Sequence, residues 1–280
     1  MIAHVAEASE ASGRVVVWID PLSPVSPLAL ETAARVASAF GSEIETVVID
    51  AADLTRIREV PHRRVGRGLV VDAPADAAGL LGERQRRLAE RWANAASVPI
   101  RHSVRNGHAI DRLAEMCASN GPWNIITLSS LPTSGLGPVI SDILANISGA
   151  TGVIVTGRKS RKQSGRVAIV AEDAERLPSM LRAAERLRSS HSPIHVLIAA
   201  ETKPAYAELD AQARLLVGNR PDVIFETTGP SRGVDGALDE CLVRTAAGFV
   251  IARFGGLLLS GDTALSRLLN IGTAPFLLVR

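Results

Sequence analysis

The sequence is short of aromatic residues and of cysteine, and both shortages exclude classes of protein. Phe, Trp and Tyr make up 3% of the 280 residues, too few for the stacking platforms of single-stranded nucleic-acid binders. The two cysteines, Cys117 and Cys241, cannot build a disulfide framework, and no CxxC or HExxH motif occurs. We therefore expect two small buried thiols, no metal site and no structural metal.

Long apolar runs and a strong excess of charge are also missing. No stretch of about 18 uncharged apolar residues occurs, so we expect no membrane span. Residues 1–13 carry acids and no basic n-region, which argues against a secretory signal. A formal net charge of +2 gives no strong attraction to nucleic acid. These absences predict a cytoplasmic protein, and the apolar content of 46% allows a sizeable core.

The chain repeats itself at an interval of about 150 residues, which is the strongest signal that the sequence contains. Residues 12–20 read SGRVVVWID, and residues 164–172 read SGRVAIVAE. Short apolar runs of this kind, bounded by Gly, are typical of buried parallel strands. Further correspondences follow in the same order: the helical patterns over 30–40 and 177–187, and the apolar segments 42–48 with 192–198, 124–128 with 249–253, and 152–155 with 276–279.

Each half therefore reads as five strands alternating with four helices, with the third helix of the second half the least distinct. This alternation predicts an α/β protein of two tandem doubly wound domains, each with a parallel sheet. We place the domains at residues 13–156 and 165–280, joined by a basic linker at 157–164. We expect each half to keep a sheet of its own.

The first half is longer by an insertion at 51–98. Its segment Arg56–Arg67 is rich in arginine, and it is either a solvated loop or the feature that recognises a partner. A helix follows, for which we predict an inner face of Leu81, Leu88, Trp92 and Ala95. His102 is expected to be a histidine at the surface or at a sheet edge.

Several segments resemble the universal stress proteins, over roughly residues 13–280. In the first half these are Val15–Asp20, Ser42–Asp50, Arg105–Ile110, Trp123–Ser130 and Gly135–Val155. The resemblance implies an adenine-nucleotide α-hydrolase-like fold. It also implies that the last strands, Val153–Val155 and Phe276–Val279, pair to form an internal pseudo-dimer. Homodimerisation through the insertion stays open.

The ATP-binding members of that family use Gly-x-x-Gly, nine residues, and then Gly-Ser or Gly-Thr. In this chain Pro138 stands where Ser or Thr is expected, and proline has no N–H to donate. In the second half Asp262-Thr263 replaces Gly-Ser, and a carboxylate repels a triphosphate. We therefore expect weak or lost ATP binding and no required cofactor. Binding of ATP or another adenine nucleotide remains the alternative.

The resemblance, and the rule that ligands of open parallel sheets lie beyond the carboxyl ends of the strands, assign the candidate ligand-binding residues. Asp20 and Glu172 are alternatively caps of local N–H groups, Gly107 is alternatively a turn residue, and the polar loop at 129–137 alternatively holds another anion or nothing. The full set is Asp20, Gly107, Ser129, Ser130, Gly135, Gly137, Glu172, Gly255, Gly256, Gly261 and Thr263.

No nucleophile–base pair, carboxylate pair or metal-ligand spacing emerges, so we assign no catalytic residue. The function expected from the resemblance is that of a non-catalytic tandem universal stress protein, a stress-response or regulatory module with an unknown protein partner. An adenine-nucleotide binder is the first alternative. An enzyme of the adenine-nucleotide α-hydrolase-like group is the second.

Overall fold

The computed structural model describes residues 13–19, 26–49, 75–105, 107–121, 123–128, 136–157, 165–228, 237–257, 259, 262–271 and 274–280. The strands are β1 (Arg14–Ile19), β2 (Glu43–Ile49), β3 (Ile100–Arg105), β4 (Asn124–Leu128), β5 (Ala150–Val155), β6 (Val167–Ala171), β7 (Ile194–Ile198), β8 (Val223–Glu226), β9 (Phe249–Arg253) and β10 (Phe276–Val279). The helices are α1 (Pro27–Phe40), α3 (Ala75–Ala95), α4 (Ala109–Ser119), α5 (Leu136–Asn146), α6 (Leu177–Leu187), α7 (Lys203–Val217), α8 (Ala237–Thr245) and α9 (Asp262–Ile271).

The predicted alternation of strands and helices is confirmed in both halves. Central strands such as β1, β4, β6 and β7 are buried along almost their whole length, as expected for parallel strands covered on both faces. Helix α1 begins with Pro27, whose missing N–H is tolerated in the first turn. It ends at Gly41, which has a φ of 60°, a left-handed conformation that glycine adopts without strain.

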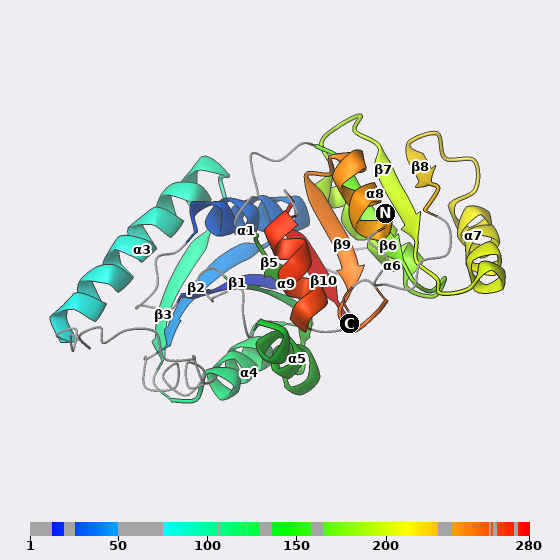
Figure 1. The fold of residues 1–280 in the computed structure, drawn as a ribbon. Helices are drawn as coiled ribbons and strands as arrows, with labels where there is room; N and C mark the ends of the chain where they lie inside the picture. Colours follow the sequence, from blue (N-terminus) through cyan, green and yellow to red (C-terminus); the bar gives the residue numbers. More distant parts are fainter. Residues whose placement is uncertain are drawn as a thin grey trace, which may run out of the picture.

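The ten strands form one sheet in the order β3-β2-β1-β4-β5-β10-β9-β6-β7-β8 (Figure 1). Within each half all pairs are parallel. One core, on the face of α4, α5, α8 and α9, contains the buried Ile140 and Leu269. The core on the other face packs α1, α3, α6 and α7 against the same sheet and contains Leu30 and Leu177.

Strands β5 and β10 join the halves as an antiparallel pair, in which Val155 lies opposite Phe276 and Gly152 opposite Val279. This pairing confirms the predicted pseudo-dimer of two doubly wound halves. The expectation that each half keeps a separate sheet was wrong. Each edge strand alone would expose unpaired backbone groups and an apolar face, and pairing removes both. Helices α5 and α9 meet on one face of the junction, and α1 and α6 on the other.

The insertion contributes the long helix α3, which packs against α1, the edge strand β3 and its neighbour β2. Ala89 and Ala93 are buried on its inner face, with Leu88 and Trp92 packed against the core. Ala95 is exposed instead, and the side chain of Leu81 lies outside the described residues. Arg84, Arg87 and Arg91 are exposed on the outer side of α3, and Arg86 is half-buried.

His102 lies on the edge strand β3, where the sequence placed it, and its Nε2 contacts Glu90 Oε1 of α3 at 2.9 Å. This contact links α3 to the edge strand β3. The segment Arg56–Arg67 and most of the linker at 157–164 lie outside the described residues, so the domain division stays a prediction. Within the described ranges, no helix is both long and apolar enough to cross a membrane.

Candidate functional site

A cavity of about 460 Å³ lies at the carboxyl ends of the second half's strands, where open parallel sheets place their ligands. The turn after β6, the turn after β7 and the segment after β9 surround it. Helix α7 closes one side, and its N-cap Thr202 accepts a hydrogen bond from the N–H of Ala205 at 3.3 Å. The lining residues are Glu172, Asp173, Ala174, Ala199, Ala200, Glu201, Thr202, Ala205, Glu208, Leu209, Gln212 and Leu257.

Glu172 and Gly256, two predicted site residues 84 positions apart in the sequence, are in direct contact here. A Cβ atom built on Gly256 would lie 1.7 Å from Glu172 Oε2 and 2.4 Å from its Cδ. Glycine at this position therefore lets the carboxylate approach the backbone of the segment after β9. The neighbouring Gly255 has a φ of 75° and open space around it, so its backbone conformation favours glycine there.

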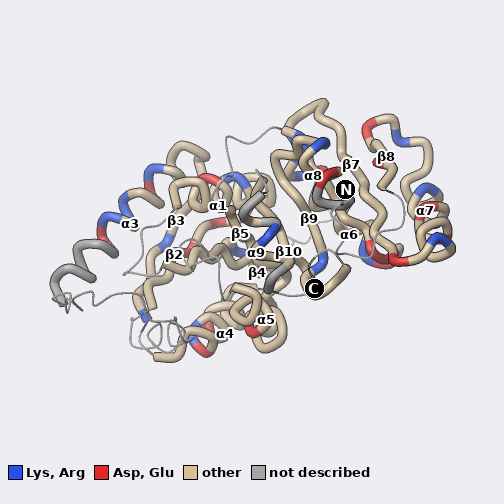
Figure 2. The backbone as a smooth tube through the Cα atoms, in the orientation of Figure 1, with Lys and Arg blue, Asp and Glu red and all other residues tan. Residues whose placement is uncertain are grey.

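The cavity is acidic. Glu172, Asp173, Glu201 and Glu208 line it, and none of its described lining residues is Lys, Arg or His. Figure 2 shows acidic segments in red between α6 and α7. Asp173 is neutralised locally: its Oδ1 accepts from the N–H of Arg176 at 2.8 Å, and its Oδ2 pairs with Arg176 Nη1 at 2.7 Å. Glu201 and Glu208 add further negative charge to the cavity, which disfavours anions.

The first half offers fewer described residues at the corresponding edge. Gly107 has a φ of 120°, the turn conformation that the sequence predicted, and its role in ligand binding stays a prediction. Gly137 is buried in the first turn of α5, which contains no acid. Of the remaining candidates, Asp20, Ser129, Ser130, Gly135 and Gly261 lie outside the described residues, and Thr263 is placed only as part of α9.

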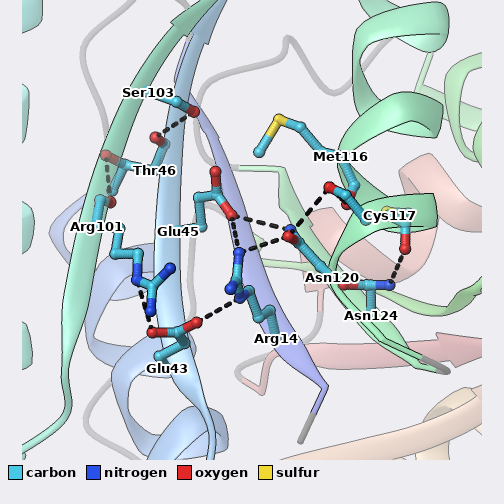
Figure 3. Close-up of polar contacts among 11 residues, drawn as sticks. Arg14, Glu43, Glu45, Thr46, Arg101, Ser103, Met116, Cys117, Asn120 and Asn124 are labelled. Atoms are coloured by element: carbon cyan, nitrogen blue, oxygen red, sulfur yellow. Dashed lines mark hydrogen bonds and ion pairs between the residues drawn. The ribbon is translucent and has the colours of Figure 1, made fainter.

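Sequence reasoning missed a polar network at the opposite, amino-terminal ends of the first half's strands (Figure 3). Arg14 Nη1 donates to Glu45 Oε2 at 2.8 Å, and Asn120 Nδ2 donates to the same oxygen at 2.9 Å. Glu43 bridges Arg14 and Arg101. These groups satisfy one another, which indicates that the network holds β1, β2, β3 and the end of α4 together. No sequence motif indicates this network, because its members lie as far as 106 positions apart in the chain.

The two cysteines are buried and unpaired with each other, as expected. Burial, followed by the nearby Glu45 charge, raises the pKa of the Cys117 thiol to about 12. Burial also raises the pKa of Cys241. Both thiols are therefore protonated near neutral pH. Nucleophilic and metal-binding chemistry requires the thiolate, so neither cysteine is suited to it.

Comparison with solved structures matches the whole architecture. A universal stress protein from Archaeoglobus fulgidus superposes with a TM-score of 0.62 at 15% identity, covering 96% of each chain. The chain has the universal stress protein fold. A second structure with this fold, a putative universal stress protein from Pseudomonas aeruginosa, matches with a TM-score of 0.57 at 16% identity over 96% of this chain and 94% of that one.

The cytoplasmic domain of a prokaryotic cation chloride cotransporter also matches, with a TM-score of 0.58 at 10% identity over 95% of each chain. Neither protein-family profiles nor curated proteins give a match. The structural matches confirm the resemblance seen in the sequence at the level of the fold. The function must be argued from the chemistry of the site.

Proposed function

We propose that this chain is a non-catalytic tandem protein of the universal stress protein type, a cytoplasmic stress-response or regulatory module whose ATP binding is weak or lost. The contact between Glu172 and Gly256 carries the proposal. Backbone N–H groups of a glycine-containing segment suit a phosphate. Here the carboxylate of Glu172 lies against that segment, so an incoming phosphate would meet a negative charge already in place.

The electrostatic cost supports the same conclusion. A triphosphate entering this cavity would lie among Glu172, Glu201 and Glu208, and like charges in a partly dehydrated site repel by several kcal/mol, on the order of 4 kcal/mol per pair at 4 Å. A regulatory role in which a protein partner binds the surface of this chain requires no nucleotide. The partner itself remains to be identified.

A second candidate function is adenine-nucleotide binding through the first half. One observation favours it: the first turn of α5 contains no acid, whereas α9, its counterpart in the second half, begins with Asp262. A helix N-terminus without acids attracts phosphate more strongly.

Calorimetry with ATP, with and without Mg²⁺, tests the proposal. We expect a Kd weaker than about 1 mM, which is less than about 4 kcal/mol of binding free energy. Glu172→Gln is expected to tighten binding to the second half, and Glu175→Gln, which removes an exposed charge outside the cavity, serves as the matched control. A micromolar Kd in the unmodified protein that Glu172→Gln leaves unchanged would favour the first-half nucleotide site and refute the proposal.

A further inference from the structure

A second cleft of about 460 Å³ lies at the junction between the two halves. It shares no lining residue with the acidic cavity. Both halves contribute to it: the end of α1, the start of β5 and Ile125 of β4 from the first, and α6, β9 and β10 from the second. Its lining residues are Phe40, Ile125, Gly149, Ala150, Thr151, Gly152, Arg176, Ser179, Met180, Ala183, Ile251, Leu277, Val279 and Arg280.

Contacts between α1 and α6 close one end of the cleft. Arg35 Nη2 of α1 donates to the carbonyl oxygen of Leu187, and the guanidinium of Arg186 lies 5.3 Å from the ring centroid of Phe40. The floor is the antiparallel β5–β10 pair. A Cβ atom on Gly152 would lie 2.9 Å from Leu277 Cδ1, so the absence of a side chain at Gly152 allows the two strands and Leu277 to pack closely there.

The walls and the rim of the cleft differ in chemistry. Phe40, Ile125, Met180, Ile251 and Leu277 make the interior apolar. The polar side chains are two arginines, Ser179 and Thr151, and no Asp or Glu is among the described lining residues. Apolar clefts with a few polar groups at one end, often between domains, are the usual form of small-molecule sites, with volumes of about 300–1,000 Å³.

The two arginines, Arg176 and Arg280, differ in the partners of their guanidinium groups. The charge of Arg176 is balanced by Asp173 at 2.7 Å, and its Nε donates to the main-chain oxygen of Arg280 at 3.0 Å. Arg280 Nη2 donates to the carbonyl oxygen of Ile147 at 3.0 Å, which is a neutral acceptor. The guanidinium of Arg280 therefore brings N–H donors to the rim, and such donors suit an anion.

We propose that this cleft binds a small amphipathic carboxylate, with its carboxylate group at Arg280 and its apolar chain lying against Phe40 and Val279. The guanidinium of Arg280 selects the anion, and the apolar walls select a hydrocarbon or aromatic body. Because both halves form the walls, an occupied cleft holds α1, α6 and the β5–β10 junction together. The site is independent of the proposed loss of ATP binding.

Calorimetric titration of the full chain with decanoate tests the proposal. We expect one molecule to bind per chain with a Kd on the order of 0.1 mM, an ordinary efficiency for a ligand of about a dozen heavy atoms. Arg280→Gln is expected to weaken binding about tenfold, the loss of one charge-assisted interaction. Arg182→Gln, on the exposed side of α6, removes the same charge outside the cleft and should leave the Kd unchanged.

Ala183→Trp fills the cleft from α6 and is expected to abolish binding, with circular dichroism confirming that the variant is folded. Decanol, which has the same chain and no charge, should bind at least tenfold more weakly than decanoate. The proposal is overturned if decanoate fails to bind at 5 mM. It is equally overturned if Arg280→Gln and Arg182→Gln weaken binding to the same extent.

Discussion

Leu278 of β10 lies directly opposite Val153 of β5, and both side chains are completely buried. The pair stands at the centre of the only antiparallel contact in the described sheet, the one that joins the two halves. We expect Leu278→Asp to lower the free energy of unfolding by about 3–5 kcal/mol, because a carboxylate would be buried without a partner. A urea or thermal melt measures the loss.

Leu215→Asp is the matched control, since Leu215 is 84% exposed on α7. It introduces the same side chain where water can solvate it, and we expect a change within about 0.5 kcal/mol. Equal melting temperatures for Leu278→Asp and the unmodified protein would mean that β10 does not pair with β5 in solution.

The contact between Glu172 and Gly256 is testable by a double-mutant cycle. Gly256→Ala places a methyl group where the Glu172 carboxylate lies, so the carboxylate must rotate away, at a cost of about 1 kcal/mol. In a Glu172→Ala background the carboxylate is absent, so this part of the cost disappears. We therefore expect a coupling energy of about 0.5–1 kcal/mol between the two substitutions, measured by urea unfolding.

Glu175→Ala provides the control background, because Glu175 is exposed beside the same turn and does not line the cavity. The cost of Gly256→Ala should be as large there as in the unmodified protein. Additive effects of Gly256→Ala and Glu172→Ala would contradict the contact, and with it the main support for weakened ATP binding.

Cysteine reactivity checks the burial of both thiols. With the pKa of Cys117 raised to about 12 and that of Cys241 raised by burial, neither thiol has an appreciable thiolate fraction at pH 8. We expect Ellman's reagent to label neither cysteine in the folded protein and both in guanidinium chloride. The variant Ser190→Cys, at an exposed position, should react at once. Rapid labelling of two thiols in the folded protein would contradict the placement of α4 and α8.

The fold was largely predictable because its signals are local and repeated. Apolar runs such as Val15–Ile19, bounded by Gly or polar residues, predict strands independently of their context. The same pattern occurs again in the second half. The edge pairing of β5 with β10 was predictable as well. The merging of both halves into one sheet by this pairing was not predicted from the sequence. Each half by itself satisfies the rules for a complete doubly wound domain.

The candidate site was predictable only in outline. Its position at the carboxyl ends of the strands follows from topology, and Glu172 and Gly256 were both named. Their contact, and the acidity that Glu201 and Glu208 add to the cavity, depend on which side chains converge from separate elements. The Arg14–Glu45–Asn120 network was missed for the same reason, since no spacing connects its members.

The ion pairs around Asp222 predict how stability responds to acid. Hydrogen bonds from Arg220, together with the nearby charges of Arg220 and Arg188, lower the pKa of Asp222 from an ordinary value of 3.8 to about 2. A carboxyl group with a lowered pKa in the folded state stabilises it at any pH above its unfolded value. That contribution is lost as the pH falls from about 4 through 2.

Asp222→Asn removes the charge at every pH and therefore exposes the size of this contribution. The side chain of Asp222 is 31% exposed, so solvent screens the pairs, and we expect a loss of about 1 kcal/mol or less between pH 5 and pH 8. The difference between the variant and the unmodified protein should shrink steadily below pH 4, as Asp222 itself becomes protonated. Urea unfolding at pH 7, 4 and 2.5 follows it, with Asp111→Asn, an exposed carboxylate on α4, as the control. A difference that stays constant down to pH 2.5 would show that the asparagine disturbs packing and that the charge of Asp222 contributes nothing.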